Sequence, residues 1–273
     1  MSWKPEPLAP IGSGTPIALT DAAASPPKGM PGRGELDRYL ADAGQRLDAL
    51  QTALYAEASR ALLVVLQGRD ASGKDGTIRR VFGVLNPQGF SISSFKAPTP
   101  LELAHDFLWR AHLAVPAKGA IGVFNRSHYE DVLVVRVRQL VPESVWRPRY
   151  EQINQFERIL TQNGVTILKF LLHISREEQR DRLLARLDDP AKHWKFSAGD
   201  LDDRNRWDQF NEAFEEMLQR TSTAEAPWFL VPADKQHVRD VLVAATVLQT
   251  LERMNPQYPG PPADLAALRR ALG

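Results

Sequence analysis

The stretch at residues 62–78, LLVVLQGRDASGKDGTI, decides how the rest of the chain is arranged. A continuous apolar run leads into a glycine-rich turn, and the turn leads into a segment of helical character. Gly68 and the pair Gly73 and Lys74 complete a G-x-x-x-x-G-K pattern, in which backbone N–H groups at a helix N-terminus surround phosphate oxygens and the lysine reaches a phosphoryl charge. The stretch therefore predicts a strand, a phosphate-binding loop (P-loop) and a helix.

One position departs from this pattern. The usual motif places a Ser or Thr hydroxyl on magnesium directly after the lysine, and this chain has Asp75 there. Either a carboxylate takes that role or the metal is held differently. Asp70, inside the turn, and Glu130, beyond a later strand, are the candidates for organising Mg²⁺ directly or through its waters, with Mn²⁺ as an alternative ion.

The composition rules out several classes of partner. The chain has 273 residues, 34 Lys and Arg against 33 Asp and Glu, and a formal charge of +1. This balance argues against nucleic acid as a partner, and an anionic substrate must be met by local charge. The absence of cysteine excludes disulfides and thiolate metal sites and fits a cytoplasmic protein. No signal peptide and no run of about 20 apolar residues is visible, so we expect a soluble protein with no membrane span.

The chain divides into one domain with two tails. Residues 1–34 hold seven of the twenty prolines and are expected to form an extended arm that lies on the domain or on a partner subunit. Residues 35–254 form the predicted domain, and residues 255–273 form a C-terminal tail. Within the domain, apolar runs alternate with amphipathic segments, which predicts an α/β fold with a mostly parallel sheet. Strands are expected at 61–66, 90–95, 120–124, 165–172 and 228–231, and helices at 35–59, 73–85, 100–113, 149–163, 203–221 and 234–254.

Functional groups gather just after the predicted strands, at the edge of the sheet where open α/β folds bind ligands. Lys96 follows the second strand and is a candidate phosphate or nucleotide contact, with a solvated loop lysine as the alternative. The third strand runs into Asn125 and Arg126. Arg126 is the best candidate for a cation that faces a transferring phosphoryl group, and an ion pair with Glu130 or Asp131 is the alternative.

A helix capped by Ser175 and a polar segment after it offer further positive charge. Arg182 and Arg186 lie four residues apart, so both face one side of that helix and could grip phosphates together. On charge count alone, a solvated face balanced by nearby aspartates is the favoured reading. The segment at residues 189–200 resembles a lid, part of a region at about 188–202, in which Lys192 and Lys195 could close over an anionic substrate.

Several motifs together resemble polyphosphate kinase family 2. They are Gly68-Arg-Asp-Ala-Ser-Gly-Lys-Asp-Gly76, Phe124-Asn-Arg-Ser-His-Tyr-Glu-Asp131, Arg186-Leu-Asp-Asp-Pro190, Lys192-His-Trp-Lys195 and Asp203-Arg-Asn-Arg-Trp207. The similarity runs in matching order over residues 35–254. It implies a P-loop kinase similar to thymidylate kinase, with three α/β/α layers and a helical lid, that moves the terminal phosphoryl of inorganic polyphosphate onto a nucleotide with magnesium.

The resemblance also implies roles for single residues. Asp70, Lys74 and Arg126 would be catalytic, and Lys74 is expected to face solvent in the empty site. Lys96, Asn125 and Glu130 are our candidate nucleotide contacts. The predicted phosphate and polyphosphate contacts are Gly68, Ala71, Ser72, Gly73, Asp75, Gly76, Arg182, Arg186, Lys192 and Lys195.

The resemblance narrows the reaction further. Many members that phosphorylate only nucleoside diphosphates carry Asp where this chain has Asn125, so the chain resembles the subgroup that uses AMP as well as ADP. It also implies a homodimer or homotetramer. From the residues alone, two alternatives stay open: an ATP-dependent nucleotide or small-molecule kinase, and a nucleotide-dependent regulatory module with little turnover.

Overall fold

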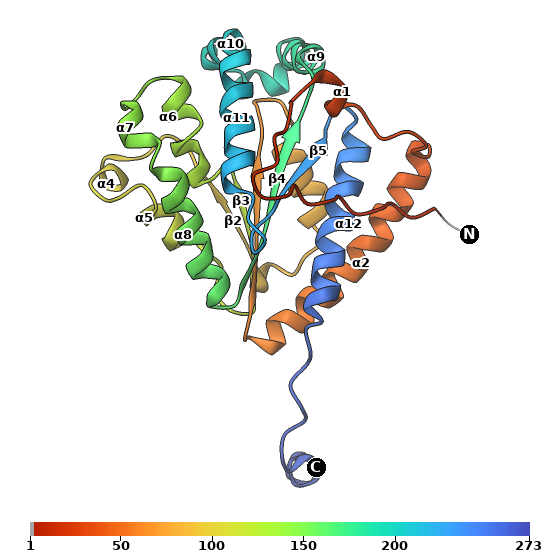
Figure 1. Cartoon of the computed structure of the whole chain (residues 1–273). Coiled ribbons are helices and arrows are strands. Elements are labelled where there is room, and N and C mark those ends of the chain that lie inside the picture. The colour runs from red at the N-terminus through yellow and green to blue at the C-terminus, as the bar shows by residue number, and fades with distance from the viewer. Residues whose placement is uncertain (1–2) are drawn as a thin grey trace.

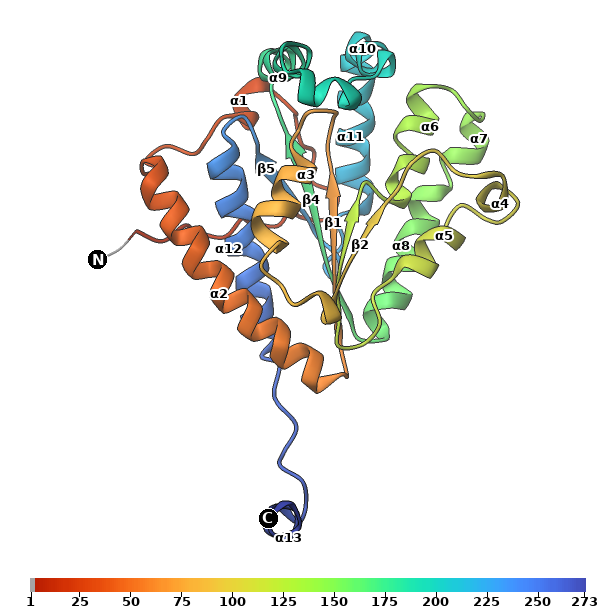
Figure 2. The same ribbon diagram turned by 180° about the vertical axis from the view of Figure 1, so that it is seen from behind.

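The computed structural model describes residues 3–273 and shows one parallel sheet between two layers of helices (Figures 1 and 2). The five strands lie in the order β2-β3-β1-β4-β5, and every neighbouring pair is parallel. They are β1 Ala61–Gln67, β2 Phe90–Ser94, β3 Ile121–Asn125, β4 Val165–His173 and β5 Trp228–Pro232. The predicted strands and the three-layer architecture are thus confirmed, with boundaries that differ by one residue.

β1 is the central strand of the sheet, and all seven of its residues are buried. It pairs with β3 on one side, Leu62 opposite Ile121, and with β4 on the other, Ala61 opposite Val165. A strand covered on both faces reads as an unbroken apolar run, which is the pattern its sequence shows. Its central position places the P-loop at the middle of the carboxyl edge.

Helices cover both faces of the sheet and its carboxyl end (Figure 2). One layer holds α2 Arg33–Glu57, α3 Lys74–Thr77 and α12 Gln236–Met254, and the other holds α5 Trp109–Ala114, α6 Val134–Val137, α8 Arg149–Gln162 and α11 Trp207–Thr221. Above the carboxyl edge lie α9 Arg176–Asp188 and α10 Ala198–Asn205. The remaining short helices are α1 Asp21–Ala24, α4 Pro100–Leu103, α7 Glu143–Trp146 and α13 Leu265–Leu272.

Three predicted helices are interrupted in the structure. Residues 203–221 divide at Arg206, after α10 ends and before α11 begins. Residues 100–113 form α4 and α5, separated by a turn in which the Asp106 carboxylate accepts the N–H of Leu108 at 2.9 Å. A short acidic side chain that bonds nearby backbone in this way competes with the helical ladder. Residues 73–85 form α3 followed by a π-helical turn, Ile78–Phe82.

The arm at residues 3–32 runs across the domain in a mostly extended conformation (Figure 1). Ile11 and Leu19 are buried, and the Ile11 N–H donates to the Trp228 carbonyl on β5 at 2.8 Å. Further along, the Leu19 N–H donates to Glu215 on α11 at 2.7 Å. The arm therefore packs on its own domain along the β5 edge.

Lys169 is the one charged residue in β4, and it is fully buried. Its ammonium donates to Glu157 at 2.6 Å, to the Tyr129 hydroxyl at 2.9 Å and to the Thr221 carbonyl at 2.7 Å. All three of its N–H donors are thus satisfied, as a buried charge requires. This network joins β4 to α8, to α11 and to the turn after β3.

None of the helices formed by residues 3–273 combines the length and the apolar character that crossing a membrane requires.

Candidate active site

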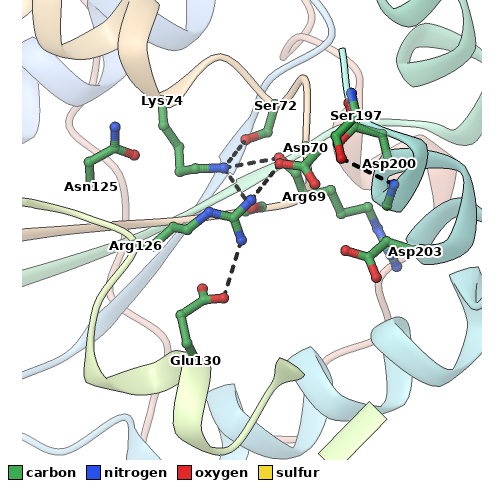
Figure 3. A network of polar contacts seen from close by, with 12 residues as sticks. Arg69, Asp70, Ser72, Lys74, Asn125, Arg126, Glu130, Ser197, Asp200 and Asp203 are labelled. Atoms are coloured by element: carbon green, nitrogen blue, oxygen red, sulfur yellow. Dashed lines mark hydrogen bonds and ion pairs between the residues drawn. The ribbon is translucent and has the colours of Figure 1, made fainter. Parts of the chain in front are cut away.

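The P-loop leaves β1 at the carboxyl edge and turns back into α3, and its lysine is buried (Figure 3). Lys74 is 8% exposed, and its ammonium donates to the carbonyls of Gly68 at 2.8 Å and Arg69 at 3.1 Å. The expectation that Lys74 faces solvent is therefore wrong, because the loop folds its own carbonyls around the side chain. Burial, assisted by the nearby Arg126, lowers the pKa of Lys74 to about 8.

The loop holds its shape through unusual backbone conformations. Gly73 has φ +97°, which glycine adopts without strain, but Ala71 has φ +65° and Arg126, on the neighbouring loop, has φ +61°. Left-handed conformations at residues other than glycine cost roughly 1–3 kcal/mol and cluster at functional sites. Two such residues facing one site support its assignment as an active site.

Arg126 links the P-loop to the turn after β3, the 3₁₀ turn His128–Asp131 (Figure 3). Its guanidinium forms an ion pair with Asp70 and a second one with Glu130 at 3.2 Å. The first joins two of the catalytic candidates, a pairing that was not predicted, and the second is the ion pair predicted as the structural alternative. Glu130 and Asp70 raise the pKa of Arg126 against its burial, while Arg126, Lys74 and Arg186 outweigh burial and lower the pKa of Asp70.

A cleft of about 680 Å³ opens beside the P-loop at the carboxyl edge. Of the described residues, eight basic and three acidic side chains line it, in a chain whose basic and acidic residues almost cancel. The local concentration of positive charge that an anionic substrate needs is thus present. The basic residues are Lys74, Lys96, Arg126, Arg182, Arg186, Lys192, Lys195 and Arg239, and the acidic ones are Asp70, Asp75 and Asp200.

The lid, residues 189–200, contributes two of these lysines from a 3₁₀ segment, Pro190–Lys195. Lys192 pairs with Asp189 at 2.7 Å, and Lys195 lies 3.8 Å from Asp75 on the P-loop side of the cleft. The Trp194 ring between them is 78% exposed. The lid therefore presents its cations to the cleft through exposed side chains with few fixed partners.

Arg182 and Arg186 line the same cleft but have different partners. Arg186 lies 3.5 Å from Asp200 at the start of α10. Arg182 donates to the carbonyls of Ala71 at 2.9 Å and Ser72 at 3.3 Å, both in the P-loop. The solvated face favoured on charge count is wrong for Arg182, because its guanidinium lies under the loop backbone.

The other predicted contacts fall in two places. Lys96 and Asn125 line the cleft, and the Asn125 amide donates to Asp75 at 2.8 Å. Ser72 is fully buried within the loop, whereas Glu130 lies on the far side of Arg126 and lines a separate cavity of about 20 Å³. That volume holds about one water molecule.

The residues present fit a magnesium ion only when phosphate completes its shell. Asp70 lines the cleft and its lowered pKa keeps it ionised, but no group of three or more His, Asp or Glu suited to a metal exists among residues 3–273. Mg²⁺ commonly takes one or two carboxylates together with substrate phosphates and waters. Asp70 suits this mode, while a metal role for Glu130, which faces the smaller cavity, stays a prediction.

Several residues that hold the site were not singled out from the sequence. Arg69 is buried and stacks on Trp207 with its guanidinium carbon 3.8 Å from the ring centroid, which ties the P-loop to α11. Asp203, which also lines the smaller cavity, has its pKa raised by burial. The motif at residues 203–207 contains both Asp203 and Trp207, so it was the available sequence signal for these two residues. Arg239 on α12 carried no sequence signal.

Comparison with known proteins identifies the family. The family model described as "Polyphosphate kinase 2 (PPK2)" matches residues 33–259. An "AMP/ADP-polyphosphate phosphotransferase" from Meiothermus ruber is 55% identical over 222 residues, covering 81% of this chain and 83% of its own length. An "ADP-polyphosphate phosphotransferase" from Rhodopseudomonas palustris is 46% identical over 227 residues, covering 79% and 78%.

A solved structure agrees with these matches. The crystal structure of polyphosphate kinase 2 from Arthrobacter aurescens TC1 superposes with a TM-score of 0.91 at 42% identity, over 96% of this chain and 94% of that one. The P-loop kinase fold is therefore confirmed. By its sequence, its fold and the P-loop at the centre of its carboxyl edge, this chain belongs to the polyphosphate kinase 2 family.

Proposed function

We propose that this protein transfers the terminal phosphoryl group of inorganic polyphosphate to AMP and to ADP, reversibly, giving ADP and ATP. Membership of the polyphosphate kinase 2 family makes it a polyphosphate-dependent nucleotide phosphotransferase. The observation that carries the proposal is the cleft, where lysines and arginines of the P-loop, β3 exit, α9 and lid surround one space. A chain of phosphates is the substrate that such a row of cations fits.

The reaction breaks the P–O bond between the last two phosphates of the donor and forms a P–O bond to a phosphate oxygen of the nucleotide. The donor leaves one unit shorter. Such a transfer needs little covalent chemistry from the protein and depends on positioning and on positive charge. In our proposal, Lys74 and the loop N–H groups hold the donor end, and Arg126 faces the moving phosphoryl group from the β3 side.

Kinases of this family generally use a divalent cation, and we propose magnesium, with manganese as an alternative. When bound, the ion supplies charge neutralisation for the phosphate oxygens. The protein's own part is to keep Asp70 ionised and oriented through Arg126.

Use of both acceptors is supported by the relatives and by Asn125. The Meiothermus ruber relative is named for AMP and ADP, and the Rhodopseudomonas palustris relative for ADP. In this chain the neutral Asn125 amide donates to the Asp75 carboxylate at 2.8 Å. A carboxylate at position 125 would face Asp75 as a like charge and would repel the α-phosphate of AMP.

The test supplies AMP, polyphosphate and magnesium to protein free of adenylate kinase. ADP should form first and ATP afterwards, with no ATP added. Conversion of ADP but not of AMP would restrict the proposal to nucleoside diphosphates as acceptors. A requirement for ATP as the phosphoryl donor would show a conventional ATP-dependent kinase instead of a polyphosphate-dependent one. Asn125→Asp is expected to lower kcat/KM for AMP about tenfold while ADP use changes much less.

We also propose a homodimer or homotetramer in the cytoplasm. These two predictions rest on the family resemblance and on the absence of cysteine. Light scattering at several protein concentrations measures the first.

A further inference from the structure

Two charges on α12 are buried directly behind the P-loop. Arg239 is 1% exposed and Asp240 is fully buried, and both lie in a helix that packs beside α3 (Figure 2). The Arg239 guanidinium donates to the Asp240 carboxylate through Nε at 2.8 Å, and its Nη2 lies 2.7 Å from the same oxygen. The carboxylate therefore fixes both the charge and the orientation of the arginine.

The free end of this guanidinium lies against the P-loop backbone. Nη1 of Arg239 donates to the Ser72 carbonyl at 3.2 Å. A Cβ added to Gly73 would overlap Nη1, and one added to Gly76 would lie 3.2 Å from Nη2. Gly73, and to a lesser degree Gly76, thus leaves room for the Arg239 guanidinium on this face of the loop.

A second arginine reaches the same carbonyl from another helix. Arg182 on α9 donates to Ser72 O at 3.3 Å, so two guanidinium groups converge on one peptide group. The chain between residues 3 and 273 contains no cis peptide, and in a trans peptide the N–H points opposite to the carbonyl. The Gly73 N–H therefore points away from both arginines, and among the described residues no backbone carbonyl accepts it.

We propose that Arg239, held by Asp240, is a positioning residue for phosphoryl transfer: it fixes the Ser72–Gly73 peptide so that its N–H is presented to a donor phosphate. This inference rests on the proposed function, since it assigns the P-loop to polyphosphate. It goes beyond the loop motif, because the residue responsible lies over 160 positions away in the sequence. Arg239 also lines the cleft, so its charge adds to the field that attracts the donor.

Asp240 connects this arrangement to the first turns after the loop. Its Oδ1 accepts the Thr77 hydroxyl at 3.0 Å, and its Oδ2 lies 3.1 Å from Nε of Arg80. A displaced Asp240 would release Arg239 and α3 together. The positioning role predicts an effect specific to the donor, whereas a purely structural role predicts a general loss of stability.

The experiment compares Arg239→Met, Arg239→Lys and Asp240→Asn with wild type, and uses Arg253→Met as the matched control. Arg253 lies on the same helix, is exposed and is outside the cleft. For each variant, kcat and the KM values for polyphosphate and for ADP are measured together with the thermal unfolding midpoint. Binding of tripolyphosphate alone is measured by calorimetry.

Arg239→Met is expected to weaken tripolyphosphate binding and to lower kcat/KM for polyphosphate about 10- to 100-fold, with the KM for ADP within about twofold. Arg239→Lys should bind tripolyphosphate more tightly than Arg239→Met, because lysine keeps the positive charge, but less tightly than wild type, because it lacks the planar guanidinium with its several N–H donors. Arg253→Met should match wild type. If Arg239→Met does not fold, the Lys variant carries the test through the same donor-specific change.

Unchanged polyphosphate kinetics in a folded Arg239→Met protein, or in Arg239→Lys if the Met variant does not fold, would overturn the inference. Equal losses toward polyphosphate and ADP that follow the unfolding midpoint would also overturn it. The wild-type assay separates the two proposals: wild-type protein that transfers nothing from polyphosphate contradicts the proposed function, whatever the variants do.

Discussion

The P-loop and the lid supply lysines to the same cleft in opposite ways. Lys74 is 8% exposed and bonded to two carbonyls of its own loop, whereas the side chains of Lys192 and Lys195 are 54% and 37% exposed and each pairs with one aspartate. The P-loop lysine is oriented before substrate arrives, and the lid lysines are free to rearrange. We infer that the P-loop and Arg126 act on the reacting phosphoryl group, while the lid binds the rest of the polyphosphate.

Of all the variants, Arg126→Met should lose the most activity, because Arg126 belongs with the P-loop to the preoriented part of the cleft. Removal of the guanidinium leaves Asp70 and Glu130 without their shared partner and removes the cation nearest the moving group. By analogy with arginines that stabilise phosphoryl transfer, kcat should fall about 10³-fold or more. Steady-state rates under saturating polyphosphate and ADP measure this. A loss confined to KM would show that Arg126 only binds substrate, as a lid residue would.

Lys74→Met should lower kcat by roughly 10²- to 10³-fold, as removal of one preorganised donor does elsewhere. The linear apolar side chain fills similar space, so circular dichroism should show an intact fold. A variant that keeps its kcat and loses only polyphosphate affinity would place Lys74 with the lid lysines and remove the contrast between the two regions.

The pH dependence should distinguish the two regions as well. Lys74 has a pKa of about 8 in the folded protein, so it is charged below that pH and neutral above it. The kcat/KM for polyphosphate should fall about tenfold per pH unit above about 8. Lys74→Arg should abolish this decrease in kcat/KM at alkaline pH, because a guanidinium stays charged. A decrease that persists in Lys74→Arg would assign the titration to another group.

Stability should change in the opposite direction over the same window. Between pH 8 and 10.5 an unfolded Lys74 holds its proton and the folded one has lost it. The unfolded state then binds more protons, so the contribution of Lys74 to the free energy of unfolding rises with pH. Chemical denaturation of wild type and Lys74→Met at pH 7.5 and 9.5 measures this contribution. A wild-type stability that falls relative to the variant would contradict the assigned pKa.

The double variant Lys192→Ala with Lys195→Ala should have the mildest effect on chemistry. We expect the KM for polyphosphate to rise about tenfold, with kcat within about threefold, and the effect to shrink as salt is added, because exposed charges are screened. Lys118→Ala, an exposed lysine outside the cleft, is the control. A fall in kcat as large as that of Lys74→Met would make the lid part of the catalytic machinery.

The predictable part of the molecule is the part whose signals are local. β1 and its loop were predictable because an unbroken apolar run and a glycine spacing lie within residues 62–78. The gathering of Lys74 and Arg126 at one edge was predictable because parallel strands end together. The helix predicted at residues 100–113 begins where expected, with Thr99 and Glu102 forming a capping box.

What escaped prediction depends on tertiary packing. The burial of Lys74 follows from the path of the loop carbonyls, which no spacing rule encodes. From the sequence, Arg239 cannot be told from other helical arginines, because its role depends on how α12 packs beside α3. Lys169 interrupts an apolar strand, and only the fold shows that it pairs with Glu157. Arg239 and Lys169 each contact elements that are distant in sequence, and these contacts cannot be read from the residues around them.

The arm also has a consequence for how copies of the protein behave toward each other. β5 is the last strand of the sheet, and the Ile11 N–H already occupies the Trp228 carbonyl on its outer side. An uncovered strand of this kind is a template onto which another chain can add. By covering it, the proline-rich arm protects the sheet from edge-to-edge aggregation, and a version without residues 1–20 should precipitate more readily at high concentration.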